Sequence, residues 1–139
     1  MRDTPPAMSE ENVELVRRGF MATVQEDWET ALGTLHPEVE IHDFDIPDAG
    51  VYRGRDGFLA WLKGWSDGWE SWRLEDIQFR DAGGDQVIAL FRMIATGGHS
   101  GLELERDDAI TYLVRGGKIV RQEYFNDQRA ALEAVGLQD

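Results

Sequence analysis

Asp43 is the residue whose position best suits acid–base chemistry. Val39 and Ile41 alternate with polar residues in a short extended run, so Asp43 shares their face of the predicted strand. That face is expected to turn toward an apolar pocket, and partial removal from water makes a carboxylate a stronger base near neutral pH. The alternative is structural, with the Asp43 carboxylate capping the turn toward Pro47. The residue pattern leaves both interpretations open.

A second candidate acid is Asp108, in a later extended run. It shares the strand face of Ile110, Tyr112 and Val114, which would place its side chain in the same pocket. The alternative is that Asp107 and Asp108 form a solvated acidic pair near a strand end. The pattern favours solvent for Asp107 and leaves Asp108 undecided.

The histidines predict no metal site. They are His36, His42 and His99, and no pair of them has the spacing of a helical or zinc-finger ligand set. His42 alternates away from Asp43, so it is not the predicted hydrogen-bond partner of that carboxylate. The chain has no cysteine, which excludes thiol catalysis and disulfides. We expect neither a metal nor another cofactor.

The composition is that of one globular domain. The chain has 139 residues, 42% of them hydrophobic, and no apolar run approaches the roughly 18 residues that span a membrane. Its net charge of −13 argues against nucleic acid and membrane surfaces as partners. Without a signal-peptide pattern or cysteines, we expect a cytoplasmic protein. We also expect a flexible tail at residues 1–8 and a single domain at 9–139.

Three helices are predicted in the first half of the chain. Ser9 caps the first helix, whose apolar residues recur every three or four positions up to Val24. Asp27 caps a shorter helix that ends at His36, because a residue before proline leaves the helical region. The third helix carries an apolar stripe at helical spacing. Its members are Phe58, Trp61, Leu62, Trp65 and Trp69.

The second half of the chain predicts strands. Four extended runs, joined by glycine pairs that suit tight hairpin corners, lie at residues 71–80, 86–96, 102–115 and 118–126. Asp127 then caps a closing helix that Gly136 ends. Helices followed by an antiparallel meander predict an α+β fold with helices on one face of a curved sheet. A pocket is expected on the concave face.

Several local strings resemble the SnoaL-like and ketosteroid-isomerase-like superfamily, which shares the cone-shaped fold of nuclear transport factor two. They are EDWE at 26–29, LHPEVEI at 35–41, YRGRDG at 52–57, RGGKIVR at 115–121 and AALEAVGL at 130–137. The resemblance implies a curved antiparallel sheet wrapped around N-terminal helices, an internal pocket and a homodimer. The strings are typical of the fold and not of one reaction, because the superfamily contains isomerases, cyclases, hydrolases, dehydratases and binding proteins.

For ketosteroid isomerases, the resemblance implies that Asp43 is the general base, which moves a proton between carbons beside a carbonyl. The tyrosine expected on the first helix is replaced here by Gly19. A second isomerase aspartate, kept protonated by apolar surroundings, matches Asp108 or Ala109. Asp108 or Tyr112 would then stabilise the developing oxyanion by hydrogen bonding.

Other branches of the superfamily match less well. Limonene-epoxide hydrolases use an arginine that bridges two aspartates; the arginine matches Arg92, but Ile94 replaces one aspartate, so epoxide hydrolysis is not expected. The Arg-Asp-Asp string at 106–108 lies on the wrong strand for that match. SnoaL-type cyclases place an acid on the last strand, which matches Glu123 or Tyr124 according to a one-residue shift. An exposed strand glutamate is the alternative for Glu123.

The resemblance also places the third helix along the mouth of the cone. Trp61 and Trp65 are therefore expected to line an apolar pocket, with Met93 and Tyr112 on the strand side, although an aromatic stripe is also typical of core packing. Two functions fit. One is a cofactor-independent isomerase or cyclase that uses Asp43 on a hydrophobic, ring-containing carbonyl compound. The other is a non-catalytic ligand-binding or dimerisation module.

Overall fold

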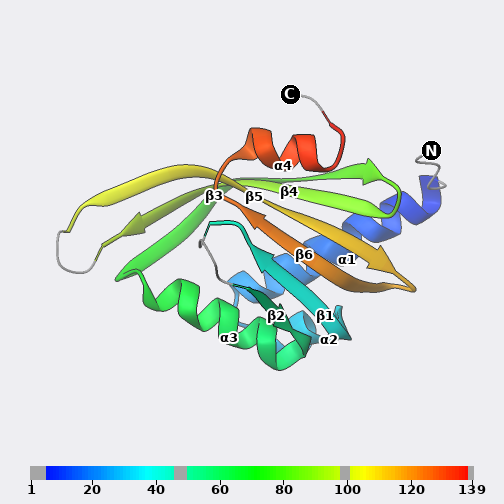
Figure 1. Cartoon of the computed structure of the whole chain (residues 1–139), viewed down its shortest axis with the longest axis horizontal. Helices are drawn as coiled ribbons and strands as arrows, with labels where there is room; N and C mark the ends of the chain where they lie inside the picture. The colour runs from blue at the N-terminus through cyan, green and yellow to red at the C-terminus, as the bar shows by residue number, and fades with distance from the viewer. Residues whose placement is uncertain (1–5, 46–49, 98–100, 138–139) are drawn as a thin grey trace.

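The computed structural model describes residues 6–45, 50–97 and 101–137, which form a curved sheet with helices on both of its faces (Figure 1). The helices are α1 (Pro6–Val24), α2 (Trp28–Gly33), α3 (Gly54–Asp67) and α4 (Gln128–Ala134). The strands are β1 (Leu35–Asp43), β2 (Val51–Arg53), β3 (Ser71–Gly83), β4 (Gln86–Thr96), β5 (Glu103–Arg115) and β6 (Lys118–Phe125). None of the described helices is long and apolar enough to cross a membrane.

The sheet has the strand order β2-β1-β6-β5-β4-β3. Strands β3 to β6 form the predicted antiparallel meander, while β1 pairs with β6 in parallel and with β2 in antiparallel fashion. The corner between β5 and β6 is built by Gly116 and Gly117, whose φ angles of 58° and 74° suit glycine. The predicted α+β class is therefore confirmed, with one parallel pairing added.

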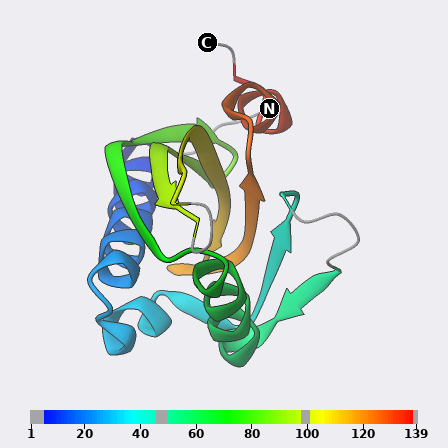
Figure 2. The same ribbon diagram turned by 90° about the vertical axis from the view of Figure 1, so that its left-hand side faces the viewer.

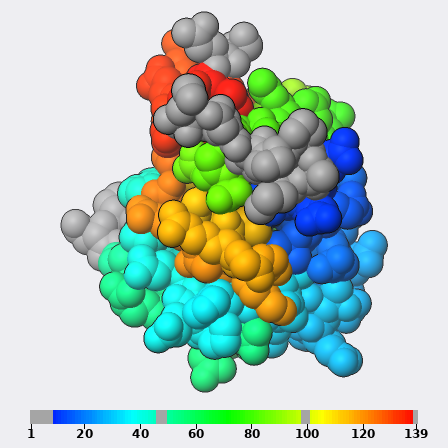
Figure 3. Space-filling model, turned by 90° about the vertical axis from the view of Figure 1, so that its right-hand side faces the viewer, coloured from blue at the N-terminus to red at the C-terminus, as the bar shows by residue number. Residues whose placement is uncertain are grey.

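Two hydrophobic clusters lie on opposite faces of the sheet. The larger one fills the concave side, on which α1 and α3 lie (Figure 2), and it includes Phe91 and Tyr112. The smaller one joins α4 to the convex side through Ile88, Leu90 and Leu132. A space-filling view of the end that carries the β5–β6 corner shows α4 at the top, with the corner lying between α1 and β1 (Figure 3). The concave side, closed by two helices, is where an internal site is expected.

Several predicted boundaries were wrong for physical reasons. Helix α1 begins at Pro6 rather than at a Ser9 cap, because proline at a first helical position forfeits no intrahelical hydrogen bond. Helix α2 ends at Gly33, and the chain continues into β1 through Pro37. The register between β1 and β6 shifts in this stretch, which tolerates the missing N–H of the proline. Helix α3 ends before Trp69.

The capping predictions at α2 and α4 are confirmed. Asp27 accepts a hydrogen bond from the backbone N–H of Thr30 at 3.4 Å, and Asp127 accepts one from that of Arg129 at 2.9 Å. Both side chains satisfy donors that the first turn of a helix leaves free. Residues 1–5 of the expected tail lie outside the described residues.

Candidate functional site

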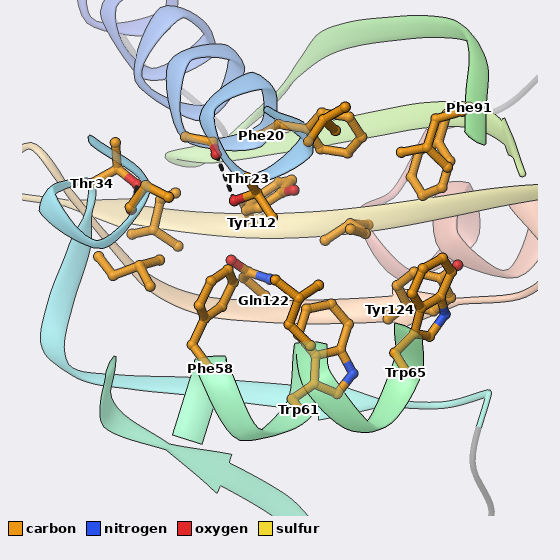
Figure 4. A pocket seen from close by; sticks show the side chains of 18 of the residues that line it. Phe20, Thr23, Thr34, Phe58, Trp61, Trp65, Phe91, Tyr112, Gln122 and Tyr124 are labelled. Carbon is orange, nitrogen blue, oxygen red and sulfur yellow. Dashed lines mark hydrogen bonds between the residues drawn. The ribbon is translucent and has the colours of Figure 1, made fainter. Parts of the chain in front are cut away.

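The cone contains a partly open cavity of about 70 Å³ between the concave face of the sheet and the helices α1 and α3 (Figure 4). Its lining is aromatic and aliphatic, with few polar side chains. The aromatic members are Phe20, Phe58, Trp61, Trp65, Trp72, Phe91, Tyr112 and Tyr124. Such a wall offers ring faces and edges to a flat apolar molecule.

Local periodicity turns these side chains toward the cavity. On α3, Phe58, Trp61 and Trp65 are three and four residues apart and share one face of the helix. On β6, Gln122 and Tyr124 are two residues apart and share the concave face. The aromatic stripe of α3 therefore belongs to the core and walls the cavity at the same time.

The structure brings three of the predicted binding residues together. Trp61, Trp65 and Tyr112 line the cavity. Met93 is fully buried in the surrounding core but is not one of the lining residues, and neither is Glu123. The roles predicted for these five residues stay predictions.

The last strand decides the alternative left open between Glu123 and Tyr124. Tyr124 lines the cavity, whereas the alternation of β6 turns Glu123 to the other face. There Glu123 accepts a hydrogen bond from the Thr111 hydroxyl at 3.1 Å and lies 2.9 Å from Arg121. Gln122, which sequence reasoning missed, lines the cavity beside Tyr124. The two-residue alternation of β6 could have indicated Gln122, but only once it is known which residues of the strand face the cavity.

Gly19 occupies the position at which an isomerase tyrosine was expected, and close packing explains the glycine. A Cβ atom at Gly19 would lie 2.6 Å from Oγ1 of Thr34, well inside contact distance. Thr34 is itself held, because its hydroxyl donates to the Ala31 carbonyl at 2.7 Å. At the same end of the cavity, the Thr23 hydroxyl donates to the Gly19 carbonyl at 2.8 Å (Figure 4). Position 19 thus supplies a close contact between α1 and Thr34 and no hydroxyl group.

Asp43 is buried, at 5% exposure, on the strand face that it shares with Val39 and Ile41. Its Oδ2 accepts a hydrogen bond from Trp61 Nε1 at 2.7 Å, and its Oδ1 accepts one from the backbone N–H of Asp45 at 2.8 Å. The carboxylate therefore lies on the apolar face and also caps the turn after β1. Asp43 is not part of the cavity wall, but Trp61 belongs to the wall and holds it directly.

Asp45, Arg106, Asp108 and Tyr124 form what we term the charged cluster. Asp108 is fully buried, and Nε and Nη2 of Arg106 donate to its two oxygens at 2.6 and 3.0 Å. The Tyr124 hydroxyl donates to the same carboxylate. Arg106 also reaches both oxygens of Asp45, at 3.3 and 3.2 Å. These surroundings differ from the apolar ones implied by the resemblance, because Asp108 is paired with a guanidinium and a hydroxyl group.

Burial and neighbouring charges both shift the pKa values in the charged cluster, whereas burial alone shifts the pKa of the nearby Tyr112. Burial opposes the charge of Arg106, but the hydrogen bond and negative charge of Asp108, together with Asp45, outweigh it and raise the pKa of Arg106. Burial, and then the negative charge of Asp108, raises the pKa of Tyr124. Burial alone raises the pKa of Tyr112. Both tyrosines are therefore neutral hydroxyl groups at physiological pH.

The arginine that bridges two aspartates in the structure is Arg106, whereas the resemblance had matched Arg92. Arg92 is largely exposed, with Nε 3.2 Å from Oδ1 of Asp107, the member of the acidic pair that was expected in solvent. Arg106 and Asp108 are two residues apart on β5, a spacing that the sequence displayed. Asp45 follows β1, and no spacing in the sequence links it to the other two.

Within the part of the chain that the structure describes, no group of three or more acidic or histidine side chains is arranged to hold a metal ion. Nε2 of His42 lies 3.1 Å from Oε1 of Glu40. His99 lies outside the described residues. The expectation that the protein uses no cofactor stays a prediction.

Solved structures share this architecture. TerC, which was crystallised with polyporic acid, superposes with a TM-score of 0.71 and 22% sequence identity, over 90% of this chain and 98% of TerC. A SnoaL-like protein of Jannaschia sp. CCS1, provisionally named a polyketide cyclase, superposes with a TM-score of 0.72 and 18% identity over 100% of both chains. At these identities, the likeness shows the fold alone.

Similarity in sequence identifies the family. An uncharacterised protein of Mycobacterium tuberculosis is 34% identical over 130 residues, which cover 88% of this chain and 94% of the relative. A family model described as the SnoaL-like domain matches residues 16–122, which is more than half of the chain. The chain belongs to the SnoaL-like family.

Proposed function

We propose that this protein binds a small, flat, largely apolar molecule in the cavity beneath the sheet. The observation that carries this proposal is the aromatic wall around free space of about 70 Å³. Protein interiors contain few voids larger than a water molecule, and an unfilled cavity costs roughly 24 cal/mol per Å³. A fully sealed, empty cavity of this size would cost about 2 kcal/mol of folding free energy, and access of water through the open side of this cavity lowers that cost. Occupation by a ligand offsets that cost.

The size of the cavity limits the ligand. Its volume is about half of the ~150 Å³ of an apolar cavity that admits benzene, so a ring enters only if part of the wall moves. Trp65 and Trp72 are the aromatic wall residues that are only half-buried, and their rings meet edge to face with centroids 5.1 Å apart. A shift of these two rings would widen the cavity for a ligand of one or two fused rings.

Fluorescence titration tests the binding function, because Trp61, Trp65 and Trp72 lie in the wall that a ligand would touch. The panel comprises steroids, polycyclic polyketide-like compounds, terpenoids and polyporic acid, the compound crystallised with TerC. A saturable change with one class supports the proposal. Silence across the panel from the folded protein contradicts it.

A pair of matched variants locates the binding. Ala31 lines the cavity, so Ala31→Leu fills part of it and is expected to abolish binding. Ala134, on the exposed face of α4, is the control, and Ala134→Leu is expected to bind like the parent protein. Near-ultraviolet circular dichroism verifies that both variants keep their packing. Equal binding by Ala31→Leu and the parent would place the ligand outside the cavity.

Proton transfer is a second candidate function, in which Asp43 acts as general base on a ring-containing carbonyl compound, as in an isomerase or a cyclase. The observation that favours it is the buried Asp43 carboxylate, bonded at 2.7 Å to the wall residue Trp61. Asp43 reaches a ligand only when the Trp61 ring swings aside and this bond breaks. Asp43→Asn keeps an acceptor oxygen for Trp61 but removes the base. We expect this variant to bind the ligand and to lose turnover.

Unchanged turnover in Asp43→Asn would remove proton transfer by this residue and leave the non-catalytic binding module. The homodimer implied by the resemblance is compatible with either function. Sedimentation equilibrium of the purified protein measures it directly.

A further inference from the structure

We infer that Tyr112 and Gln122 together recognise a carbonyl oxygen on the ligand of this cavity, so that the ligand class is a flat ring ketone. The inference rests on the proposed binding function and names its substrate class. It starts from the polar groups that an otherwise apolar wall retains.

Tyr112 and Gln122 are direct neighbours across two strands. The antiparallel register of β5 and β6 places them opposite each other, and both belong to the cavity lining. Both residues are buried, with only 4% of their surface exposed. Figure 4 shows both between the α1 side and the α3 side of the cavity. Opposed residues of this kind have Cβ atoms about 5 Å apart, so their polar ends can converge on one ligand atom.

Neither polar group is used by the protein itself. Among the described residues, the Tyr112 hydroxyl and the Gln122 amide have no hydrogen-bond partner, whereas every fully sealed polar side-chain atom has one. The two groups are therefore not sealed, and they open onto the free space that both residues line. A buried polar group without a hydrogen-bond partner lowers the stability of the folded protein. A hydrogen bond between this group and a ligand offsets that loss.

The other buried polar groups of the wall are satisfied within the protein. Thr23 donates to the Gly19 carbonyl, Thr34 to the Ala31 carbonyl and Tyr124 to Asp108. Trp61 donates to Asp43. Among the fully buried side chains of the described wall, hydrogen-bonding capacity is thus left at one place, on β5 and β6; the indole N–H groups of Trp65 and Trp72 belong to half-buried residues at the edge of the wall.

The chemistry of the pair favours an acceptor oxygen on the ligand. Burial raises the pKa of Tyr112, so its hydroxyl stays protonated and donates. The Gln122 amide offers N–H donors beside it. A ketone oxygen has two lone pairs and accepts from both groups, while its ring contacts the aromatic wall. A hydrocarbon of the same shape would leave both polar groups unpaired.

The test compares two probes with the same bicyclic skeleton, α-tetralone and tetralin, of which only the first has a carbonyl. We expect the parent protein to bind α-tetralone about tenfold more tightly, as two neutral hydrogen bonds provide. Tyr112→Phe and Gln122→Leu should each reduce this preference to about threefold, with little change in tetralin affinity. Tyr52→Phe and Gln78→Leu are matched controls, because neither residue lines the cavity. Both controls should keep the tenfold preference.

A spectroscopic readout accompanies the affinities. The infrared carbonyl stretch of bound α-tetralone should lie at lower frequency in the parent protein than in the two wall variants. Equal affinity for the two probes, or a preference that survives both wall variants, overturns the inference while the binding function stands. Failure of both probes and of the whole panel overturns the binding function itself, and the inference with it.

Discussion

Two groups of buried polar residues lie on the same face of β5 and β6, and they differ in how they are satisfied. In the charged cluster, Asp108 accepts from Arg106 and Tyr124, and Arg106 also holds Asp45. Four residues along β5, Tyr112 faces the cavity next to Gln122 with no partner in the described chain. Neighbouring positions of one sheet thus hold a fully paired group and an unpaired one.

The difference follows from charge. An unpaired ion in the interior costs several kcal/mol, so a buried carboxylate is kept only with its counter-ion. A neutral hydroxyl or amide costs less, and a fold can leave it free for a ligand. The charged cluster is therefore expected to hold the end of β1 against β5 and β6. The pair formed by Tyr112 and Gln122 is expected to matter for binding and little for stability.

Loss of the guanidinium should have the largest effect on stability. Arg106→Met leaves the Asp45 and Asp108 carboxylates facing each other, with Asp108 fully buried. Because Arg106 is partly exposed, we expect the lower end of the usual penalty, a loss of about 3 kcal/mol in urea unfolding. Arg92→Met breaks the exposed pair with Asp107 and should change stability little. Equal losses in both variants would contradict the structural role of the cluster.

The next-largest difference in stability is expected between substitutions of the two tryptophans of α3. Trp61→Phe removes a hydrogen bond to the buried Asp43 carboxylate, whereas Trp65→Phe changes a wall residue that makes no hydrogen bond to a charged side chain of the described residues. A hydrogen bond to a charged group contributes about 2 kcal/mol, so the free energy of unfolding should fall by about that much more in Trp61→Phe. Thermal and urea unfolding measure the difference. Equal losses would show that ring size alone matters.

Alkaline pH should weaken the fold through the buried tyrosines. Unfolded tyrosine ionises at a pKa of about 10, and the folded pKa values of Tyr112 and Tyr124 are both raised. Their contribution is fully present below about pH 10, and above it the unfolded state releases protons first. Stability should then fall by about 1.4 kcal/mol per pH unit for each tyrosine. Urea midpoints across this range measure the slope.

The same titration has an internal control. Tyr112→Phe leaves Tyr124 as the remaining tyrosine with a raised pKa, so the alkaline slope should fall to about half. A slope that the substitution leaves unchanged would show that other groups drive the loss.

The smallest effects compare the two hydroxyl groups directly. Tyr124→Phe removes a donor to buried Asp108, and because that carboxylate keeps both of its hydrogen bonds from Arg106, the loss should be only about 1 kcal/mol. Tyr112→Phe removes an unpartnered hydroxyl and should leave stability unchanged or slightly higher. Each variant differs from the parent by one oxygen atom, so packing losses cancel. A larger loss in Tyr112→Phe would show that its hydroxyl is already used by the fold.

Much of the fold could be predicted because its determinants are local. The stripe from Phe58 to Trp65 has the period of a helix, and it forms the cavity wall of α3. The alternation of Val39, Ile41 and Asp43 has the period of a strand, and all three residues are buried. The glycine pairs at 83–84 and 116–117 marked two corners of the meander, and all four of these glycines have the positive φ that few other residues adopt, whereas Gly98 of the third pair lies outside the described residues. Chain order then gave the fold class.

The candidate site could be predicted only in part. Trp61, Trp65 and Tyr112 lie in the cavity wall. The sequence left it uncertain by one residue which side chains of β6 face the cavity, so Gln122 was not predicted. A one-residue shift exchanges the two faces of a strand, so the period alone cannot choose between Glu123 and its neighbours. Pairing with β5 makes that choice in the folded sheet.

By itself, the sequence determined which residues share a face, because helix and strand periods act within a few residues of chain. Only the tertiary structure decided which faces meet. It joined β1 to β6 in parallel and set Thr34 against Gly19. It also brought Asp45 within reach of Arg106, 61 residues further along the chain. Such contacts depend on closure of the whole sheet around the helices, and no local spacing encodes them.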